Sequence, residues 1–328
     1  MAILKENSKI GGALIYSEAN IKSAPEIVML SQVSYPKTFS KGIACHGYGD
    51  TNNGMGNMDK LEISTETISK IGWGTSSRNY CGFAMKNDFT YGYAYGGYGN
   101  TSPDSDDAPA MTKENMSKTD MANETQEEVV FDCGTSAEQS NGLFNNSGHS
   151  YVFREGNSIK KHTHSDDSQS VTDLWDLNYQ TTNLAFSNYY GAGYIVGGYD
   201  SNLHFYKMNF DSSTYSVLAG TSLSKQYDGA ANGYGSKVVT QIKGNASKDL
   251  GFFHFTTEMQ TIAGKSAIKK SGEVQPAGGN GYDYNIGGYE SGGSGQNPYS
   301  EKCDQTTAVC SMLPDSSYSM SSAAQYIV

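Results

Sequence analysis

The sequence predicts an all-β fold, and its composition and its patterning both point to this class. Glycine occurs 38 times and tyrosine 24 times, which is twice the phenylalanine count of 12. Charged residues make up 17% of the 328 residues, against roughly a quarter in an average domain. Ser, Thr, Asn, Gly and Tyr take their place, which is typical of β proteins rich in turns. Helical periodicity is nearly absent, whereas short alternating segments recur along the chain.

Two short patterns alternate and define a repeat. One is an amphipathic strand followed by Ser, Thr, Asp or Asn, and it begins at residues 59, 117, 160, 206, 252 and 302. The other is a strand rich in Gly and Tyr, seen most clearly in GYAYGGYG (92–99), GYIVGGYD (193–200) and DYNIGGYE (283–290). The interval from Lys60 to Tyr93 is 33 residues, and so is that from Lys118 to Tyr151. Steps of about 45 residues match one four-stranded blade of a β-propeller of the kelch size class.

The number of units predicts six blades, with seven as the alternative. In the first unit the four strands are expected at DKLEIS, ISKIGWG, RNYCGFAMK and TYGYAYGG (59–64, 68–74, 78–86 and 90–97). The last amphipathic segment begins at 302 and no Gly/Tyr strand follows it. We therefore expect the first Gly/Tyr strand, 43–49, to complete the C-terminal blade and close the ring, because closure removes two exposed sheet edges.

The repeat covers residues 41–328 and leaves an N-terminal arm, 1–40, which we expect to dock to a neighbouring protein. Residues 99–116 lengthen one step of the repeat and hold two prolines and three aspartates, so they predict a surface insert. The Gly-rich run 287–295 predicts another loop. No interdomain linker is evident between 41 and 328.

Charge and composition exclude several functions. A net charge of −11 and a pI of about 5.0 argue against nucleic-acid binding, which needs a basic face. Arg78 and Arg154 are the only arginines, too few for the three-arginine carboxylate grip of sialidase-type propellers. The chain contains no run of 18 apolar residues, so no membrane span is predicted. The N-terminus lacks the apolar region of a signal peptide. We therefore expect the protein to be made in the cytoplasm without a signal peptide.

Two histidines are candidate metal ligands. His162 and His164 are two residues apart on one predicted strand, so they face the same side and are placed to share a metal ion. The competing interpretation is a polar outer strand, since lysines and aspartates surround them. The five cysteines, at positions 45, 81, 133, 303 and 310, contain no C-x-x-C pair and predict buried free thiols.

Three carboxylates follow the Gly-Gly position of their strands: Asp50, Asp200 and Glu290. Three such groups around one channel predict a Ca²⁺ site, and the alternative is that they are ordinary turn residues. No G-x-S-x-G elbow and no phosphate-binding G-x-x-x-x-G-K-S/T loop occurs. We therefore expect no catalytic residues and no cofactor.

Most tyrosines are expected to pack between blades. Tyr98, Tyr199 and Tyr289 follow the Gly-Gly position and are candidates to line one rim. Aromatic rims bind sugars or partner proteins through stacking and apolar burial.

The segments TYGYAYGGY, GAGYIVGGYD with YKMNFDSSTYSVLAG, and GYDYNIGGYE resemble the kelch-like propeller proteins carried in virions of tailed phages, particularly of marine hosts. The resemblance covers residues 42–328. The first, third and fifth Gly/Tyr strands depart from it, since they lack Gly-Gly, and Phe252 stands where the other segments have lysine. The resemblance implies a virion part of head, collar or tail, present in many copies, with contacts to other virion proteins and to host-surface glycans. It implies no catalytic residue.

Three functions follow as expectations. The first is a non-enzymatic structural or adhesion component of a phage particle, located in the virion and docked through the arm. The alternative is a carbohydrate-binding or carbohydrate-cleaving propeller, which predicts convergent carboxylates and exposed aromatics on one face. A cytoplasmic kelch-type adaptor is a third class, and it would require a partner domain.

Overall fold

The computed structural model divides into two compact units, Met1–Lys37 and Thr38–Val328. It describes residues 9–10, 13–14, 39–48, 54–79, 82–85, 90–95, 98–99, 116–131, 141–144, 148–153, 159–172, 186–189, 192–196, 204–209, 212, 214–221, 237–241, 249–265, 277–279, 281–286, 288–290, 295–317 and 324–327. Every regular element among them is a β-strand. No helix in these ranges is long and apolar enough to cross a membrane.

The first unit contains one small hairpin. Strands β1 (Lys9–Ile10) and β2 (Ala13–Leu14) pair antiparallel. The predicted arm, 1–40, extends slightly past this unit, because Phe39 is buried with Ala44 and Leu61 of the second unit.

The second unit contains six antiparallel sheets of three to five described strands, numbered here in chain order, and one two-stranded sheet of β24 (Gly288–Glu290) and β25 (Gly295–Asn297). Sheet 1 is β28 (Ala324–Ile327), β3 (Lys41–Tyr48), β4 (Gly54–Glu62), β5 (Thr67–Asn79) and β8 (Tyr98–Gly99). Sheet 2 is β6 (Gly82–Met85), β7 (Tyr91–Tyr95), β9 (Met116–Asp120) and β10 (Thr125–Val129). Sheet 3 is β11 (Asn141–Phe144), β12 (His149–Phe153), β13 (Ile159–Thr163) and β14 (Ser168–Thr172).

Sheets 4 to 6 continue the pattern. Sheet 4 is β15 (Phe186–Tyr189), β16 (Ala192–Val196), β17 (His204–Asn209) and β18 (Thr214–Thr221). Sheet 5 is β19 (Lys237–Gln241), β20 (Asp249–His254) and β21 (Met259–Lys265). Sheet 6 is β22 (Ala277–Gly279), β23 (Tyr282–Asn285), β26 (Ser300–Asp304) and β27 (Cys310–Leu313).

The two sequence patterns form two adjacent, paired strands in each of the six sheets, and the register is the same throughout. The paired positions, in order, are Ile43 with Lys60, Tyr93 with Lys118, Tyr151 with Lys161, Tyr194 with Lys207, Val239 with Phe252, and Tyr284 with Lys302. Each sheet is therefore one copy of the repeat.

The predicted phase of the repeat is wrong. We expected an amphipathic strand to share a blade with the Gly/Tyr strand about 33 residues later, whereas it pairs with the Gly/Tyr strand that comes before it. The segment 78–86 is likewise not one strand, because β5 ends at Asn79 in sheet 1 and β6 begins at Gly82 in sheet 2. Strands that are close in sequence usually pair as neighbours. The regular 33-residue interval instead separates an amphipathic strand from the Gly/Tyr strand of the next sheet.

The two ends of the second unit share a sheet, but not the one expected. We expected 43–49 to complete the blade that contains the segment at 302, whereas that segment, β26, lies in sheet 6 and pairs with β23. The C-terminal strand β28 instead pairs with β3, with Tyr326 opposite Ile43. Sheet 1 is thus completed by the tail of the chain.

Two other expectations concern loops. Part of the Gly-rich run 287–295 is a hairpin, since β24 (Gly288–Glu290) pairs with β25 (Gly295–Asn297). Between β8 and β9, residues 100–115 of the predicted insert lie outside the described residues.

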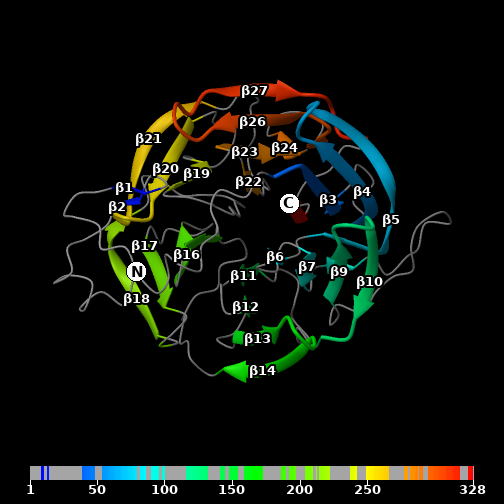
Figure 1. Ribbon diagram of the computed structural model, residues 1–328, viewed down its shortest axis with the longest axis horizontal. Helices are drawn as coiled ribbons and strands as arrows, with labels where there is room; N and C mark the ends of the chain where they lie inside the picture. The colour runs from blue at the N-terminus through cyan, green and yellow to red at the C-terminus, as the bar shows by residue number, and fades with distance from the viewer. Residues whose placement is uncertain are drawn as a thin grey trace. The chain divides into compact units, whose positions relative to one another are not determined.

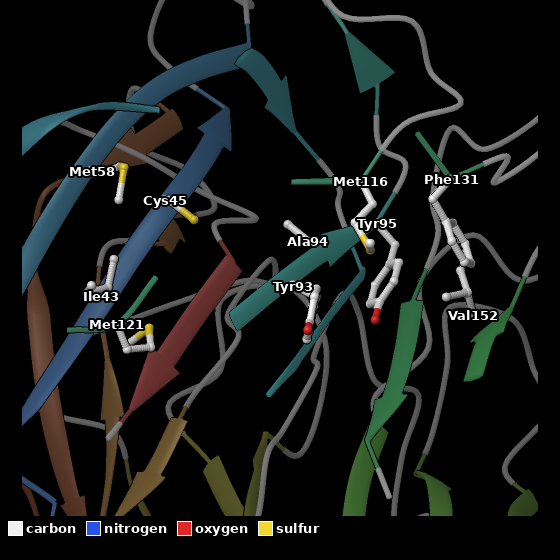
Figure 2. Packing of buried hydrophobic residues seen from close by; sticks show 10 residues of the cluster. All are labelled: Ile43, Cys45, Met58, Tyr93, Ala94, Tyr95, Met116, Met121, Phe131 and Val152. Atoms are coloured by element: carbon white, nitrogen blue, oxygen red, sulfur yellow. The ribbon is translucent and has the colours of Figure 1, made fainter. Parts of the chain in front are cut away.

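The core lies between consecutive sheets. In Figure 1 each sheet of this unit lies next to the sheets that precede and follow it in the chain. Figure 2 shows one cluster in which side chains from sheets 1, 2 and 3 meet; its members include Cys45, Tyr93, Tyr95, Phe131 and Val152. A second cluster joins sheets 4 and 5, a third joins 5 and 6, and a fourth joins 6 and 1. Strands β7 and β20 are buried at four consecutive positions, as expected for strands packed on both faces.

Candidate functional site

The hairpin turns that follow the amphipathic strands share one backbone feature. The last turn residue has a left-handed backbone conformation in the five turns in which that residue is described, with φ between 54° and 57°; these residues are Glu66, Glu124, Asp167, Glu258 and Ala308. This conformation is uncommon for residues with a Cβ. In the turns of β9 and β26 an aspartate at the strand end stabilises the bend, because Asp120 Oδ1 accepts hydrogen bonds from the N–H groups of Ala122 and Asn123 at 2.9 Å, and Asp304 acts in the same way.

The carboxylates at this turn position reach back to the preceding sheet. Each one forms an ion pair with a lysine of the middle amphipathic strand there, and we call these pairs the inter-sheet clasps. They are Lys60 with Glu124 at 3.2 Å, Lys118 with Asp167 at 2.7 Å, Lys207 with Glu258 at 2.5 Å, and Lys302 with Glu66. The last pair joins sheet 6 to sheet 1 across 236 residues of sequence.

A tyrosine of the lysine's own sheet completes three of the clasps. The ammonium groups of Lys118, Lys207 and Lys302 lie 4.6, 5.6 and 4.8 Å from the ring centres of Tyr91, Tyr194 and Tyr282. Each lysine is held between an aromatic face and a carboxylate, so electrostatic attraction acts on two sides. The lysine side chains are 15–33% exposed, so screening by water limits each pair to about 1 kcal/mol.

The ionisation of these groups follows from their contacts. Hydrogen bonds from Lys41, at 2.7 Å, and from Lys60 hold the pKa of Glu124 below its usual value, although partial burial opposes them. Burial alone would lower the pKa of Lys118, but the hydrogen bond and charge of Asp167, helped by Glu127, together raise it. Each shift favours the charged form, so Glu124 and Lys118 are both charged at neutral pH.

Sheets 5 and 6 replace the ion pair with an apolar contact. Phe252 occupies the lysine position of sheet 5, and Ala308 occupies the carboxylate position of sheet 6. Both belong to one buried cluster with Leu250 and Cys303. Neither Phe252 nor Ala308 is charged, so this contact does not bury a lysine without its carboxylate.

His162 and His164 lie on one face, as predicted, but in the packed contact between sheets 2 and 3. Both are buried, and their ring centres are 5.2 Å apart. His162 Nδ1 lies 2.9 Å from the hydroxyl of Tyr95, and its Nε2 lies 3.2 Å from Asp167 Oδ1. His164 Nε2 lies 2.6 Å from the hydroxyl of Ser150, and its ring stacks on that of Tyr93.

Burial lowers the pKa of His162 to about 4, although Asp167 acts in the opposite direction. The ring is therefore neutral at pH 7 and has one donor and one acceptor. Asp167 only accepts hydrogen bonds, so Nε2 carries the proton and Nδ1 accepts from the Tyr95 hydroxyl. A metal ion at His162 would have to displace one of these two partners, and the proposed histidine metal site stays a prediction.

The remaining predicted site residues are only partly described. Asp50, Asp200 and Tyr199 lie outside the described residues. Tyr98 lies in β8 opposite Asn79 of β5, and Tyr289 and Glu290 lie in β24. The shared calcium site and the tyrosine rim therefore stay predictions.

One group of three candidate metal ligands occurs within the described ranges: Glu301, Cys303 and Cys310. The two cysteines form a disulfide, which corrects the expectation that all the cysteines are free thiols. They lie directly opposite each other on β26 and β27, with their Cα atoms 4.0 Å apart, a placement that their sequence positions alone do not reveal. Cys45 is a buried thiol outside any disulfide, as expected.

The clasps were missed at the level of sequence, although a signal was present. Lysine precedes an acidic residue by six positions in Lys60/Glu66, Lys118/Glu124 and Lys161/Asp167. That constant spacing indicates a shared structural position. It does not show that each carboxylate binds the lysine of the preceding sheet, which depends on how the sheets pack.

Comparisons with known proteins identify the fold and nothing more. No protein-family model matches the chain, and no curated protein matches it. Among solved structures, "Structure of YjhT" matches with a TM-score of 0.57 and 11% sequence identity, over 85% of this chain and 98% of that chain. In all, 913 solved chains match, and a fold this common does not specify a function. The predicted all-β, β-propeller-like class is confirmed at this coarse level.

Proposed function

We propose that this protein is a non-enzymatic, rigid β-propeller that serves as a structural or adhesion component of a tailed-phage particle. The inter-sheet clasps carry the proposal. Catalysis or ligand binding would draw on lysines, carboxylates and histidines. Here these groups connect one sheet to the next, the lysines and carboxylates through ion pairs and the buried histidines through Tyr95 and Tyr93. Such contacts between sheets favour a stiff propeller, which suits a structural part of a larger assembly.

The proposal includes a closed ring of six blades, one for each sheet of the second unit. Its support is that sheet 6 makes with sheet 1 the same kinds of contact that other consecutive sheets make. Lys302 binds Glu66, and Tyr284, Ile286 and Leu313 pack against Ala44 and Leu61. A seventh blade would have to form from residues outside the described ranges. An experimental density map that shows seven sheets, or an open end between sheets 6 and 1, would overturn this part.

The N-terminal unit, 1–37, is the proposed docking segment to other virion proteins. It forms a compact unit of its own, which is consistent with a segment that binds elsewhere. Host-surface glycans are the proposed second partner, contacted by the rim that carries Tyr98, Tyr199 and Tyr289. The proposal assigns many copies to each particle.

The test is to purify particles of a phage that encodes this chain and to measure its copy number by mass spectrometry. We expect many copies in the intact-particle fraction. A variant lacking residues 1–37 should fold normally but be lost from particles, whereas the exposed substitution Lys70→Ala should be incorporated as well as the wild type. Absence of the wild-type chain from purified particles would refute the virion role.

A glycan array separates the structural role from the alternative of a carbohydrate-active propeller. Binding that depends on the three rim tyrosines, without any change in the glycan, supports adhesion. Release of shortened glycan products would instead show that the protein is an enzyme and would contradict the proposal.

A further inference from the structure

The face of sheet 6 that packs against sheet 5 brings a carboxylate close to two sulfur atoms. Glu301 and Cys303 are two residues apart on β26, so they share a face, and Cys310 lies directly opposite Cys303 on β27. One oxygen of Glu301 and the two sulfurs all lie within 4.8 Å of one another. Three atoms this close can coordinate one metal ion.

The hairpin, and not the disulfide alone, keeps the cysteines together. The turn between them is closed by backbone hydrogen bonds from Asp304 N–H to the Val309 carbonyl at 3.0 Å and from Ala308 N–H to the Asp304 carbonyl at 2.8 Å. The carboxylate of Asp304 accepts two more N–H groups, from Thr306 and Thr307. The two thiols should therefore stay adjacent after the disulfide is reduced.

The surroundings favour a cation. Glu301 and Cys303 are only 3% and 5% exposed, and Cys303 packs with Leu250, Phe252 and Ala308. Phe252 stands where sheets 1, 2 and 4 present a lysine, so sheet 5 offers an apolar ring here instead of an ammonium group. Negative charge in an apolar environment attracts a metal ion strongly, because few water molecules screen it.

We propose that this cluster is a redox-gated site for a thiophilic divalent ion, Zn²⁺ in the cell, with Cys303, Cys310 and Glu301 as its ligands. A dithiol reductant of the thioredoxin class gives two electrons and two protons to the disulfide and becomes a disulfide itself. The ion then displaces the two thiol protons into solvent and binds two thiolates and the carboxylate. A water molecule takes the fourth position of the tetrahedron. In an oxidising environment the disulfide occupies the site and excludes the ion.

The experiment uses the full-length protein and Cd²⁺ as the probe, because cadmium–thiolate bonds absorb in the ultraviolet. Protein reduced with a phosphine should bind Cd²⁺ at this site with that absorption, and Zn²⁺ should compete for it. Oxidised protein should not show the absorption. The double variant Cys303→Ser/Cys310→Ser should lose it, whereas Cys45→Ser, which removes a buried thiol in sheet 1, should keep it.

The variant Glu301→Gln tests the third ligand. We expect it to keep the absorption but to weaken Cd²⁺ binding by on the order of tenfold or more, given that even the hydrogen-bonding partners of ligands contribute 10–100-fold. Thermal unfolding of each variant verifies that it is folded. Absorption that survives in the double cysteine variant would place the metal at one of the three remaining cysteines, Cys45, Cys81 or Cys133, and overturn the proposal. Unchanged affinity in Glu301→Gln, or no binding by the reduced protein, would also overturn it.

Discussion

Asp167 connects three side chains from two sheets through one carboxylate. Its Oδ2 accepts from Lys118 of sheet 2 at 2.7 Å, and its Oδ1 accepts from His162 of its own sheet at 3.2 Å. His162 in turn accepts from Tyr95 of sheet 2 at 2.9 Å. The contact between sheets 2 and 3 thus contains a chain of hydrogen bonds from an ammonium to a buried phenol.

The substitution Asp167→Asn tests that chain. Asparagine tolerates the left-handed backbone conformation of this position, so the turn itself should be preserved. The ion pair with Lys118 is lost, and we expect the free energy of unfolding in urea to fall by about 1–2 kcal/mol. The neighbouring Asp166→Asn is the control, because Asp166 is exposed and contacts Ser168 within its own turn. Equal effects of the two changes would contradict the inter-sheet role.

His162 makes stability depend on pH in a defined window. Its pKa is about 4 in the folded protein and about 6.5 when unfolded, so the unfolded chain binds more protons between these values. Stability is therefore fully present above pH 6.5 and falls as the pH drops to 4, by roughly 2–3 kcal/mol from this residue. Unfolding measured from pH 4 to 8 should show this fall in the wild type, and His162→Gln should reduce the slope. An identical slope in both proteins would refute the assignment.

At the scale of strands and sheets, the sequence predicted where the strands lie but not which strands pair. The alternation of the Gly/Tyr and amphipathic patterns identified two adjacent strands of each sheet, because buried strands need a regular side-chain period. It did not identify which copies pair, since the interval from Lys60 to Tyr93 is as regular as a true repeat although the two residues belong to different sheets. The proximity of Cys303 and Cys310, and the contact of each clasp with the preceding sheet, depend on packing that a periodic pattern does not contain.

Gly264 on β21 marks a point where two sheets approach closely. A Cβ added there would lie 2.5 Å from the carbonyl oxygen of Ala308 in the turn of sheet 6. Gly264→Ala should therefore push the backbones of sheets 5 and 6 apart and destabilise the protein by about 1–3 kcal/mol in chemical denaturation. Gly72 on β5 is the matched control, because no atom lies within 4 Å of its added Cβ. A neutral Gly264→Ala would show that the contact is looser than described.

The apolar contact of Phe252 with Ala308 should be exchangeable for a clasp. Phe252→Lys alone places an ammonium group against apolar neighbours, and Ala308→Glu alone adds a carboxylate without its lysine, so each should be destabilising. The double variant restores the pair that Lys207 and Glu258 make one sheet earlier. A double-mutant cycle should give a favourable coupling of about 1 kcal/mol or more. Simple additivity would mean that the two positions are not equivalent to a clasp.

At the scale of the whole 38–328 unit, three independent contacts connect its beginning with its end. β28 pairs with β3, Lys302 binds Glu66, and the buried carboxylate of Asp59 accepts hydrogen bonds from the backbone N–H and the hydroxyl of Ser317. Each contact spans most of the chain, so each adds loop-closure entropy to the barrier for folding. The resulting structure should unfold as one cooperative unit, because opening any sheet exposes the core it shares with its neighbours.

Removal of residues 318–328 tests how far that cooperativity depends on the tail strand. The truncation deletes β28 but keeps Ser317 and its contact with Asp59, so β3 loses its four partner residues on β28 and becomes an exposed edge strand. From typical cross-strand contributions we expect a loss of roughly 2–4 kcal/mol in unfolding free energy. The free edge should also drive self-association that size-exclusion chromatography detects. Deletion of residues 1–37, which form a separate compact unit, should leave both measurements unchanged. If the tail truncation stays monomeric and as stable as the wild type, then β28 contributes little and the ends of the unit are held by Lys302, Asp59 and the apolar cluster between sheets 6 and 1.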